Sequence, residues 1–436
     1  MVSGFSIFPF RLRTRTGASS LSTVLILLSG VAASAAPLSK ADDAFVDDLS
    51  RRAFRFFLEQ TDPKTGLTAD RAGTDGKQAA GVASVASTGF GLSALCAGAE
   101  RGWIAPEKAR ERARVTLGFL LRSAPHERGF FYHFLDMKTG ARAWSSEAST
   151  IDTALLLGGV LTARQCFRDD PEVVALATKL YERVDFPWMM KGEPPLLSMG
   201  WKPETGFIAA RWDTYSEHML LDLLAIGSPT HPIPAKTWDG WRRDLVSYSS
   251  FSYVAGDKPL FIHQYSHAFV DFRGKYDGHG LDYFQNSVAA TMAQRRFFMD
   301  LAAEFPTYSK DVWGLTASDG PRGYTAWGAP PRDPSIDGTV VPCAAGGSLM
   351  FTPKESLSAL REMKARWGAK VYGRYGFTDA FNPATGWTGP DVIGIDQGII
   401  LLSAENLRGG RVWRWFMKNP EIVRAMKSVG FQEIKP

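Results

Sequence analysis

Two kinds of helical segment alternate along this chain, and the alternation limits the folds open to it. Segments 82–99 and 149–167 are apolar almost all round, whereas segments 43–58, 107–121 and 171–184 are apolar on one side and charged on the other. A helix that is apolar on every side must be covered on every side, while an amphipathic helix exposes one face to water. The alternation therefore predicts an inner group of helices wrapped by an outer group.

The number of helical segments suggests how the two groups are arranged. About a dozen segments follow residue 40, which fits six helical hairpins closed into a toroid, the (α/α)6 arrangement. One helix start is marked by Thr352 and Glu355 around Pro353, a pattern that predicts a capping box. Strand-like patches such as 129–134 are too few for a sheet-based domain. We expect an all-α protein with long loops that form a cleft at one end of the toroid.

The first 35 residues differ from the rest in charge and hydropathy. Arg11, Arg13 and Arg15 precede an apolar run at 21–31, and the small residues at 33–35 follow it. This order is typical of a secretory signal peptide, and the run is shorter than the roughly 20 residues that span a bilayer. An uncleaved anchor is the alternative. We expect export to the periplasm or the medium of a bacterium, without stable membrane insertion once the signal is removed.

The remaining chain, residues 36–436, is expected to form a single domain because no Pro- or Ser-rich linker interrupts it. The formal net charge of +5 includes the three leader arginines, so the mature chain is nearly neutral and does not favour a nucleic-acid partner. Three cysteines give no disulfide framework. Seven histidines show no close ligand spacing, since His263 and His267 lack an obvious third ligand, so neither a metal nor a cofactor is expected. The oligomeric state is left open.

Four turns of one pattern punctuate the chain. They span residues 62–66, 136–140, 202–206 and 382–386, and each ends in Thr-Gly. Glycine supplies the positive φ that closes such a turn. Each turn leads into aromatic and acidic residues, namely Asp70, Trp144, Glu147, Trp212, Tyr215, Glu217, Trp387, Asp391 and Asp396. We interpret this recurrence as one shared cleft, with ordinary turns as the alternative.

Carboxylates stand at the starts of three apolar helical segments. Glu217 precedes one, Asp152 lies in the first turns of another with Glu147 just before it, and Asp396 precedes the third. A first-turn acid interacts with the helix dipole by less than about 1 kcal/mol, which is the structural alternative. Burial of an unpaired carboxylate costs several kcal/mol, so an inward acid must be paired or functional. Glu405, deeper in the third segment, is interpreted as structural.

Two further segments combine aromatic and polar groups. His263 and Gln264 lie in an aromatic stretch followed by Arg273, and Asp319 lies in a loop rich in small residues. Sugar rings stack on aromatic faces, and their hydroxyls need polar partners. These side chains are therefore expected to bind sugar or support a catalytic carboxylate, with a purely structural network as the alternative.

These motifs resemble the glycoamylase-like domain family, which includes glycoside hydrolase family 144, the bacterial β-1,2-glucanases. The resemblance covers roughly residue 43 to the end and rests on several motifs in the same order: Ser146-Glu147 with 151–154, Tyr215 with Glu217, 227–232, 263–267, 314–320, 376–382 and 395–398. It implies an (α/α)6 toroid and hydrolysis of β-1,2-linked glucan with inversion. The family commonly has Tyr-Asn-Glu where this chain has Ser216 before the glutamate, so bond specificity or cutting mode could differ.

Inversion requires a protonated acid and a carboxylate that activates water. We expect Glu217 to be the acid and Asp396 the base, acting directly or through a water or substrate hydroxyl. Glu147 and Asp152 are held in reserve as catalytic partners or sugar anchors. The other expected substrate-binding residues are Trp144, Trp212, Tyr215, His263, Gln264, Arg273, Asp319 and Trp387. A helix start favours ionised Glu217, whereas burial by aromatic neighbours favours its protonated form. The sequence alone does not decide which effect is larger.

Three other functions remain open at this level. A retaining transglycosylase would use Glu147 and Glu217 as close partners. A polysaccharide lyase would need a Tyr, His and Arg set beside an acidic sugar, which the near-neutral charge disfavours. A non-catalytic periplasmic glycan-binding protein would keep the aromatic residues without needing the carboxylates.

Overall fold

The structure is a computed structural model that describes residues 38–77, 81–192 and 195–434. The predicted signal peptide lies outside the described residues. From Leu38 onward the chain forms one compact unit by its internal contacts. Within the described part, no helix combines the length and apolar character needed to cross a membrane.

The protein is mostly helical, as predicted. Each predicted helical segment corresponds to a helix, and the observed ends differ from the predicted ones by a few residues. For example, α2 begins at Val85 after a short strand, and α4 begins at Thr150 with Ser149 as its N-cap. The α-helices are α1 (Lys40–Glu59), α2 (Val85–Glu100), α3 (Pro106–Arg122), α4 (Thr150–Cys166), α5 (Pro171–Glu182), α6 (Met219–Gly227), α7 (Tyr265–Phe269), α8 (Tyr283–Asp300), α9 (Pro342–Gly347), α10 (Pro353–Trp367), α11 (Gly394–Leu407), α12 (Arg411–Phe416) and α13 (Pro420–Ser428). Short 3-10 helices span Phe186–Met190, Ala235–Asp239, Leu260–His263 and Gly368–Lys370.

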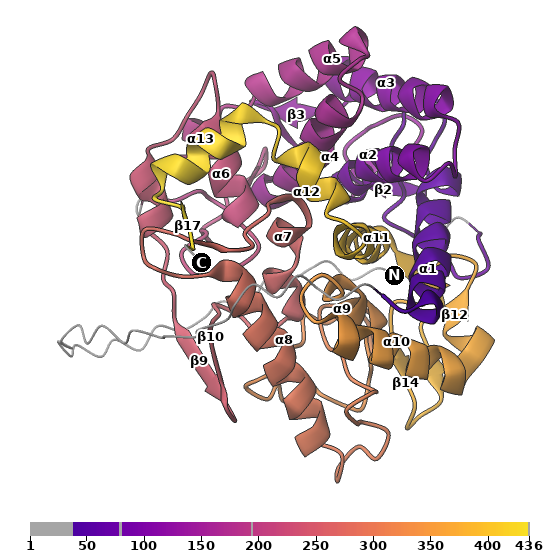
Figure 1. The fold of residues 1–436 in the computed structure, drawn as a ribbon. Helices are drawn as coiled ribbons and strands as arrows, with labels where there is room; N and C mark the ends of the chain where they lie inside the picture. The colour runs from indigo at the N-terminus through magenta and orange to yellow at the C-terminus, as the bar shows by residue number, and fades with distance from the viewer. Residues whose placement is uncertain (1–37, 78–80, 193–194, 435–436) are drawn as a thin grey trace, which may run out of the picture. The chain divides into compact units, whose positions relative to one another are not determined.

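The expected inner and outer groups of helices are both present. Helix α2 packs against α4, α4 against α6, α6 against α7, and α11 against α7, α9 and α2. Nearly every residue of α2, α4 and α11 is buried. The amphipathic helices lie outside them, with α1 on α11, α3 on α2, α5 on α4, α13 on α6 and α10 on α9 (Figure 1). Burial on all sides thus follows the apolar pattern of the sequence.

The connections contain more strand than the all-α prediction allows. Short antiparallel strands pair two by two, except β6, β7 and β8, which form a three-stranded sheet. They are β1 (Arg71–Gly73), β2 (Val82–Ser84), β3 (His126–Glu127), β4 (Phe130–Phe131), β5 (Phe134–Asp136), β6 (Ala148–Ser149), β7 (Gly200–Lys202), β8 (Gly206–Phe207), β9 (Leu245–Tyr248), β10 (Phe251–Val254), β11 (Lys275–Tyr276), β12 (Tyr372–Gly373), β13 (Gly376–Phe377), β14 (Phe381–Asn382), β15 (Trp387–Thr388), β16 (Asp391–Ile393) and β17 (Gln432–Glu433). With two to four residues, each strand is too short for a period in the sequence to reveal it.

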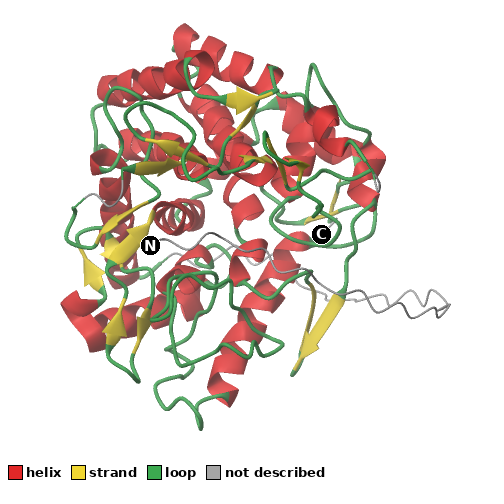
Figure 2. Ribbon diagram, turned by 180° about the vertical axis from the view of Figure 1, so that it is seen from behind, coloured by secondary structure: helices red, strands yellow, loops and turns green. Residues whose placement is uncertain are grey.

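These strands fix the beginnings of the inner helices. Strand β2 runs directly into α2, β6 into α4 and β16 into α11, and each is paired with a strand from another connection. Seen from behind, the strands lie among the loops that connect the helices (Figure 2). The backbone just before each of these three helices is therefore held by hydrogen bonds rather than left free.

The four predicted turns are confirmed. Gly66, Gly140, Gly206 and Gly386 have φ values of 70°, 74°, 80° and 76°. In the first turn, the Oδ1 atom of Asp62 accepts hydrogen bonds from the next amides at 2.8 and 3.0 Å, and the second and fourth turns repeat this pattern. The predicted capping box is wrong, because the Thr352 hydroxyl pairs with that of Ser356 at 3.1 Å instead of capping the helix.

Helices α2 and α4 approach each other so closely that only glycine fits at their contact. A Cβ atom added to Gly159 would lie 1.9 Å from the carbonyl oxygen of Gly89. Because that oxygen belongs to the backbone of a buried helix, the clash cannot be relieved by rotating a side chain. The position therefore requires glycine in this packing.

We expect Gly159→Ala to lower the free energy of unfolding by about 3 kcal/mol, because overpacking against a rigid neighbour forces the helices apart. Guanidinium chloride titration followed by circular dichroism would measure the loss. Ser93→Ala is a matched control, since the buried Ser93 hydroxyl of α2 has no hydrogen-bond partner among the described residues. Equal midpoints for the two variants would contradict the expected close packing.

Candidate active site

The predicted carboxylates do lie at the starts of inner helices. Asp152 is in the first turn of α4, Asp396 is in the first turn of α11, and Glu217 comes two residues before α6. All three residues are buried. The negative charge of Asp152 acts on Glu217, so the starts of α4 and α6 adjoin.

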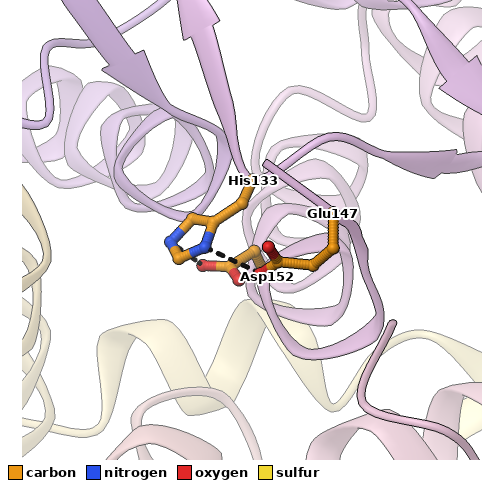
Figure 3. A group of neighbouring side chains, drawn as sticks. All are labelled: His133, Glu147 and Asp152. Carbon is orange, nitrogen blue, oxygen red and sulfur yellow. Dashed lines mark hydrogen bonds and ion pairs between the residues drawn. The ribbon is translucent and has the colours of Figure 1, made fainter. Parts of the chain in front are cut away.

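A histidine joins two of the predicted acids. His133 lies between strands β4 and β5, and its backbone amide donates to the Glu147 carbonyl at 2.9 Å. Its Nδ1 atom lies 3.1 Å from Glu147 Oε1 and its Nε2 atom 3.3 Å from Asp152 Oδ1 (Figure 3). The Ser149 hydroxyl donates to the other Asp152 oxygen at 2.5 Å. One imidazole thus holds two carboxylates with its two nitrogen atoms.

The pKa values of this triad follow from its geometry. Burial alone would lower the pKa of His133, but the charges of Asp152 and Glu147 outweigh it and raise the pKa to about 9. Burial pushes the pKa of Glu147 up, yet the hydrogen bond from His133 lowers it overall. The pKa of Asp152 is raised by burial despite His133. At neutral pH the group therefore contains an imidazolium beside an ionised Glu147.

The same three residues are the metal-ligand candidates of the described chain. One ligand atom from each of His133, Glu147 and Asp152 lies within 4.8 Å of the others. A cation there would require His133 to lose its proton, because a ligating nitrogen must be unprotonated. Both imidazole nitrogens face carboxylates, so protonated His133 already provides the positive charge that balances Glu147 and Asp152.

This triad makes stability depend on pH. The pKa of His133 is raised from an ordinary 6.5, so its contribution is complete below pH 6.5 and is lost as pH rises through 9. We expect the unfolding free energy of the wild type to exceed that of His133→Gln by on the order of 2 kcal/mol at pH 6, with the gap closing by pH 10. Urea titrations at a series of pH values would measure the gap. A gap that stays constant with pH would show that His133 is neutral in the fold.

The environment of Glu217 shifts its pKa in the opposite direction to that of Glu147. Burial raises the pKa of Glu217 to about 7, with further contributions from the charges of Asp152 and Asp257, while the hydroxyl of Ser216 donates to its carboxylate and partly offsets them. The Ser266 hydroxyl donates to the Glu217 carbonyl at 2.5 Å and ties this segment to α7. The increase in the Glu217 pKa caused by burial is therefore larger than the decrease expected from its position at a helix start. A carboxyl that is about half protonated at neutral pH can act as a general acid.

Asp396 belongs to a second cluster of acids. It shares a hydrogen bond with Asp379, and burial raises the pKa of both, so the pair holds a proton that two separate aspartates would lose. The thiol of Cys343 contacts Asp396 as well. Asp379 Oδ2 also accepts a hydrogen bond of 2.6 Å from the Asp319 amide.

Arg71 supplies the positive charge at this cluster. Its guanidinium lies 3.1 Å from Asp70, 2.9 Å from Asp319 and 3.8 Å from Asp391. The pKa of Arg71 is raised by these carboxylates despite burial, so it stays charged. Asp319 is thus held between an arginine and the Asp379–Asp396 pair.

Two tyrosines lie within electrostatic range of acids that the sequence analysis assigned to catalysis. Burial raises the pKa of Tyr265, and the charges of both Asp396 and Glu217 raise it further. The pKa of Tyr324 is raised by burial and by Asp396, Asp379 and Asp70, although its ring is 43% exposed. The Tyr265 hydroxyl therefore lies within electrostatic range of both proposed catalytic residues, and Tyr324 reaches the Asp396 cluster from a loop.

The predicted aromatic residues divide into exposed and buried ones. Trp144 is 58% exposed and its ring lies 4.9 Å from that of Phe134, which stacks on His133 at 3.8 Å. Trp212 is buried, donates from Nε1 to the Thr150 hydroxyl at 3.0 Å and stacks on a histidine. Trp144 therefore offers a free ring face beside the triad, whereas Trp212 braces the starts of α4 and α6.

Tyr215 and His263 form a buried pair. The Tyr215 hydroxyl lies 3.2 Å from His263 Nδ1, and burial lowers the pKa of His263 to about 3, so the imidazole is neutral. The Gln264 amide donates to the Ala344 carbonyl and the Ser348 hydroxyl, both at 2.8 Å. Tyr215, His263 and Gln264 therefore make hydrogen bonds within the protein interior.

Arg273 and Trp387 make contacts with residues other than those of the two acid clusters. The Arg273 guanidinium pairs with Asp271 at 2.8 Å and lies 4.1 Å from the ring centre of Trp413, a residue of α12. Trp387 is half-buried in β15, which pairs with β14. Within the described part of the chain, the hydrogen bonds, ion pairs and ring contacts of these two side chains include none of the clustered acids.

The sequence analysis missed two members of the site. His133 was not selected because it stands alone in an aromatic stretch, and no spacing rule links it to an acid 14 residues later. Asp379 was seen only as part of the 376–381 motif, although it contacts Asp396 directly. A signal was available for Asp379, since it lies just before the fourth turn, where the other acids cluster.

Comparison with known proteins identifies the family of the chain. The Glycoamylase family model, described as "Putative glucoamylase", matches residues 209–420. The exo-β-1,2-glucooligosaccharide sophorohydrolase (non-reducing end) of Parabacteroides distasonis is 28% identical over 443 residues, which cover 92% of this chain. The alignment spans 60% of that longer protein.

Two solved structures match nearly end to end. The endo-β-1,2-glucanase of Chitinophaga pinensis, in complex with sophorotriose and glucose, superposes with a TM-score of 0.82 and 28% identity, covering 91% of this chain and 99% of that one. A protein of Bacteroides fragilis with the same description as the family is 31% identical, with a TM-score of 0.82 and coverage of 92% and 99%. Both the overall sequence and the fold are therefore similar to those of these proteins, and the chain belongs to the Glycoamylase family.

Proposed function

We propose that this protein is a glycoside hydrolase that cleaves β-1,2-linked glucan, with Glu217 as general acid and Asp396 as general base. The observation that carries the proposal is Glu217 itself, a buried carboxyl at a helix start whose pKa is raised to about 7. The substrate class rests on the similarity to an endo-β-1,2-glucanase and to an exo-acting sophorohydrolase. A transferase on the same glucan would need a close nucleophile, and Glu147 is instead engaged by His133.

In this mechanism Glu217 donates its proton to the leaving glycosidic oxygen, while Asp396 draws a proton from the attacking water directly or through a substrate hydroxyl. Attack from the opposite face inverts the anomeric centre. Asp379 lies beside Asp396 and orients it by hydrogen bonding. Ionised Glu147 serves as an acceptor for sugar hydroxyls, and Trp144 offers the exposed ring on which a glucose unit stacks.

We further propose that the protein folds as an (α/α)6 toroid, forms one catalytic domain and is exported. The packing of α2, α4, α6, α7, α9 and α11 inside α1, α3, α5, α10 and α13 supports an (α/α)6 toroid with a cleft at the acid-bearing ends, with α8 packed on the 3-10 helix Leu260–His263 that precedes α7. We assign residues 36–436 to one catalytic domain. The leader pattern of residues 1–35 supports export, which fits a polysaccharide substrate outside the cytoplasm.

The test is product analysis after incubation with linear β-1,2-glucan, with β-1,3-glucan, β-1,4-glucan and starch as parallel substrates. We expect short glucose oligomers from the β-1,2 polymer alone. A ladder of products would indicate internal cutting, and the disaccharide alone would indicate cutting from a chain end. The anomeric form of the first product, read by proton nuclear magnetic resonance, tests inversion.

Cleavage of starch without cleavage of β-1,2-glucan would overturn the substrate class but keep the hydrolase. Longer rather than shorter products with added sophorose would identify a transglycosylase. Binding of the glucan with no product, retained when Glu217 is changed to glutamine, would identify a binding protein.

A further inference from the structure

The helices α2 and α4 carry a matched pair of cysteines at their closest packing line. Gly89 of α2 touches Gly159 of α4, and a Cβ atom at either glycine would lie 2.5 Å or less from backbone of the other helix. Cys96 follows the first glycine by seven residues and Cys166 follows the second by seven residues. Seven residues are about two helical turns, so each cysteine lies on the same face as its glycine.

The equal offsets bring the two thiols together. Helices that touch backbone to backbone at the glycines and run in the same direction remain close two turns further along, and the Cys166 thiol is near enough to raise the pKa of Cys96. No cysteine is bonded to another in the structure as it stands, and Cys343 contacts Asp396 in the acid cluster instead. The pairing is therefore specific to Cys96 and Cys166.

We propose that Cys96 and Cys166 are a disulfide-forming pair that cross-links the inner helices α2 and α4 when the protein meets a disulfide oxidant. Cys166 is half-buried and Cys96 is fully buried, so Cys166 is the thiol that an oxidant reaches first. Burial also raises the pKa of Cys96, which leaves it the poorer first nucleophile.

The reaction balances as two thiol–disulfide exchanges. The Cys166 thiolate attacks one sulfur of the oxidant disulfide, forms a mixed disulfide and releases one thiol. The Cys96 thiolate then attacks the Cys166 sulfur and releases the second thiol. The protein loses two protons and two electrons, and one molecule of the oxidant disulfide is reduced to two thiols.

A cross-link between Cys96 and Cys166 would change the stability of the protein, which two unreactive buried thiols would not do. It closes a loop of about 70 residues in the unfolded chain, which restricts that chain and raises the stability of the fold. It is remote from Asp396 and Glu217 in sequence and joins helices that already touch, so the acid clusters need not move.

The experiment treats the purified protein with oxidised glutathione, blocks free thiols with an alkylating reagent in denaturant, and analyses a non-reduced digest by mass spectrometry. We expect one peptide pair joined through Cys96 and Cys166, two hydrogens lighter than the sum of its parts, with Cys343 alkylated. We also expect a higher midpoint of guanidinium unfolding for the oxidised protein, reversed by dithiothreitol.

The Cys343→Ser variant should give the same cross-link and the same shift, whereas Cys166→Ser should give neither. Three results would overturn the proposal: full alkylation of Cys96 and Cys166 after oxidation, a glutathione adduct on Cys166 that never exchanges, or a cross-link between two chains. None of these readouts depends on glucan hydrolysis, so they remain decisive whatever the substrate.

Discussion

Replacing Glu217 by glutamine is expected to lower the rate of β-1,2-glucan hydrolysis by about 10²- to 10⁴-fold, the usual contribution of a general acid. Glutamine keeps the size of the side chain and its place at the start of α6 but has no proton to donate to the leaving oxygen. Glucan binding should persist, because the exposed ring of Trp144 and the ionised Glu147 are unchanged. The loss should therefore fall on kcat rather than KM.

The pH profile makes this prediction sharper. With the pKa of Glu217 raised to about 7, the wild-type rate should fall as pH rises above 7, since the acid form disappears. The residual rate of Glu217→Gln should lack this alkaline decline. Reducing-sugar release at a series of pH values measures both, and Glu107→Gln on the exposed face of α3 serves as the control. Full activity in Glu217→Gln would remove Glu217 from the acid role.

The largest expected effect on stability comes from Glu405. This residue of α11 is fully buried, and its carboxylate lies 3.0 Å from Arg101, 2.8 Å from Arg411 and 4.0 Å from Arg408. Replacing it by alanine leaves arginines without their shared buried partner. We expect Glu405→Ala to lower the free energy of unfolding by about 3–5 kcal/mol, the usual cost of breaking a buried ion pair from one side.

Guanidinium chloride titration would measure this loss. Glu111→Ala, which removes an exposed acid whose ion pair within the described residues is with Lys108 on its own helix, should leave the midpoint unchanged. Glu405→Gln should fall between the two, because the amide retains hydrogen bonding without charge. If Glu405→Ala unfolded at the wild-type midpoint, the arginines would have to find other partners, and the buried network would not be a main support of the fold.

The sequence was informative where a pattern extended over many residues. The apolar character of α2, α4 and α11 continues for three turns or more, so their burial could be read directly, as could the amphipathic α1, α3 and α5. Strands of two to four residues carry no such pattern, and the all-α prediction missed most of them beyond patches such as 129–134. The Thr352 capping box failed because a favourable motif does not decide which partner a hydroxyl selects.

The site shows the same division. Asp152, Glu217 and Asp396 were predicted because each stands at the start of an apolar segment, a local signal. His133 could not be found that way, since its partners, Glu147 just before β6 and Asp152 in α4, meet it only through the strand pairing of the fold. The balance of charge at Glu217 also required the structure, because it depends on how fully neighbouring elements exclude water.

The packing of α11 against both α1 and α2 has a consequence for how the chain folds. Helix α2 is apolar on nearly every side, yet one of its covering helices lies about 300 residues later in the sequence. During synthesis that face stays exposed until almost the whole polypeptide is available, because contacts of such separation form late and slowly. A nascent chain that lacks residues 394–407 therefore presents a continuous apolar surface, and it depends on chaperones or on delayed folding until its last helices arrive.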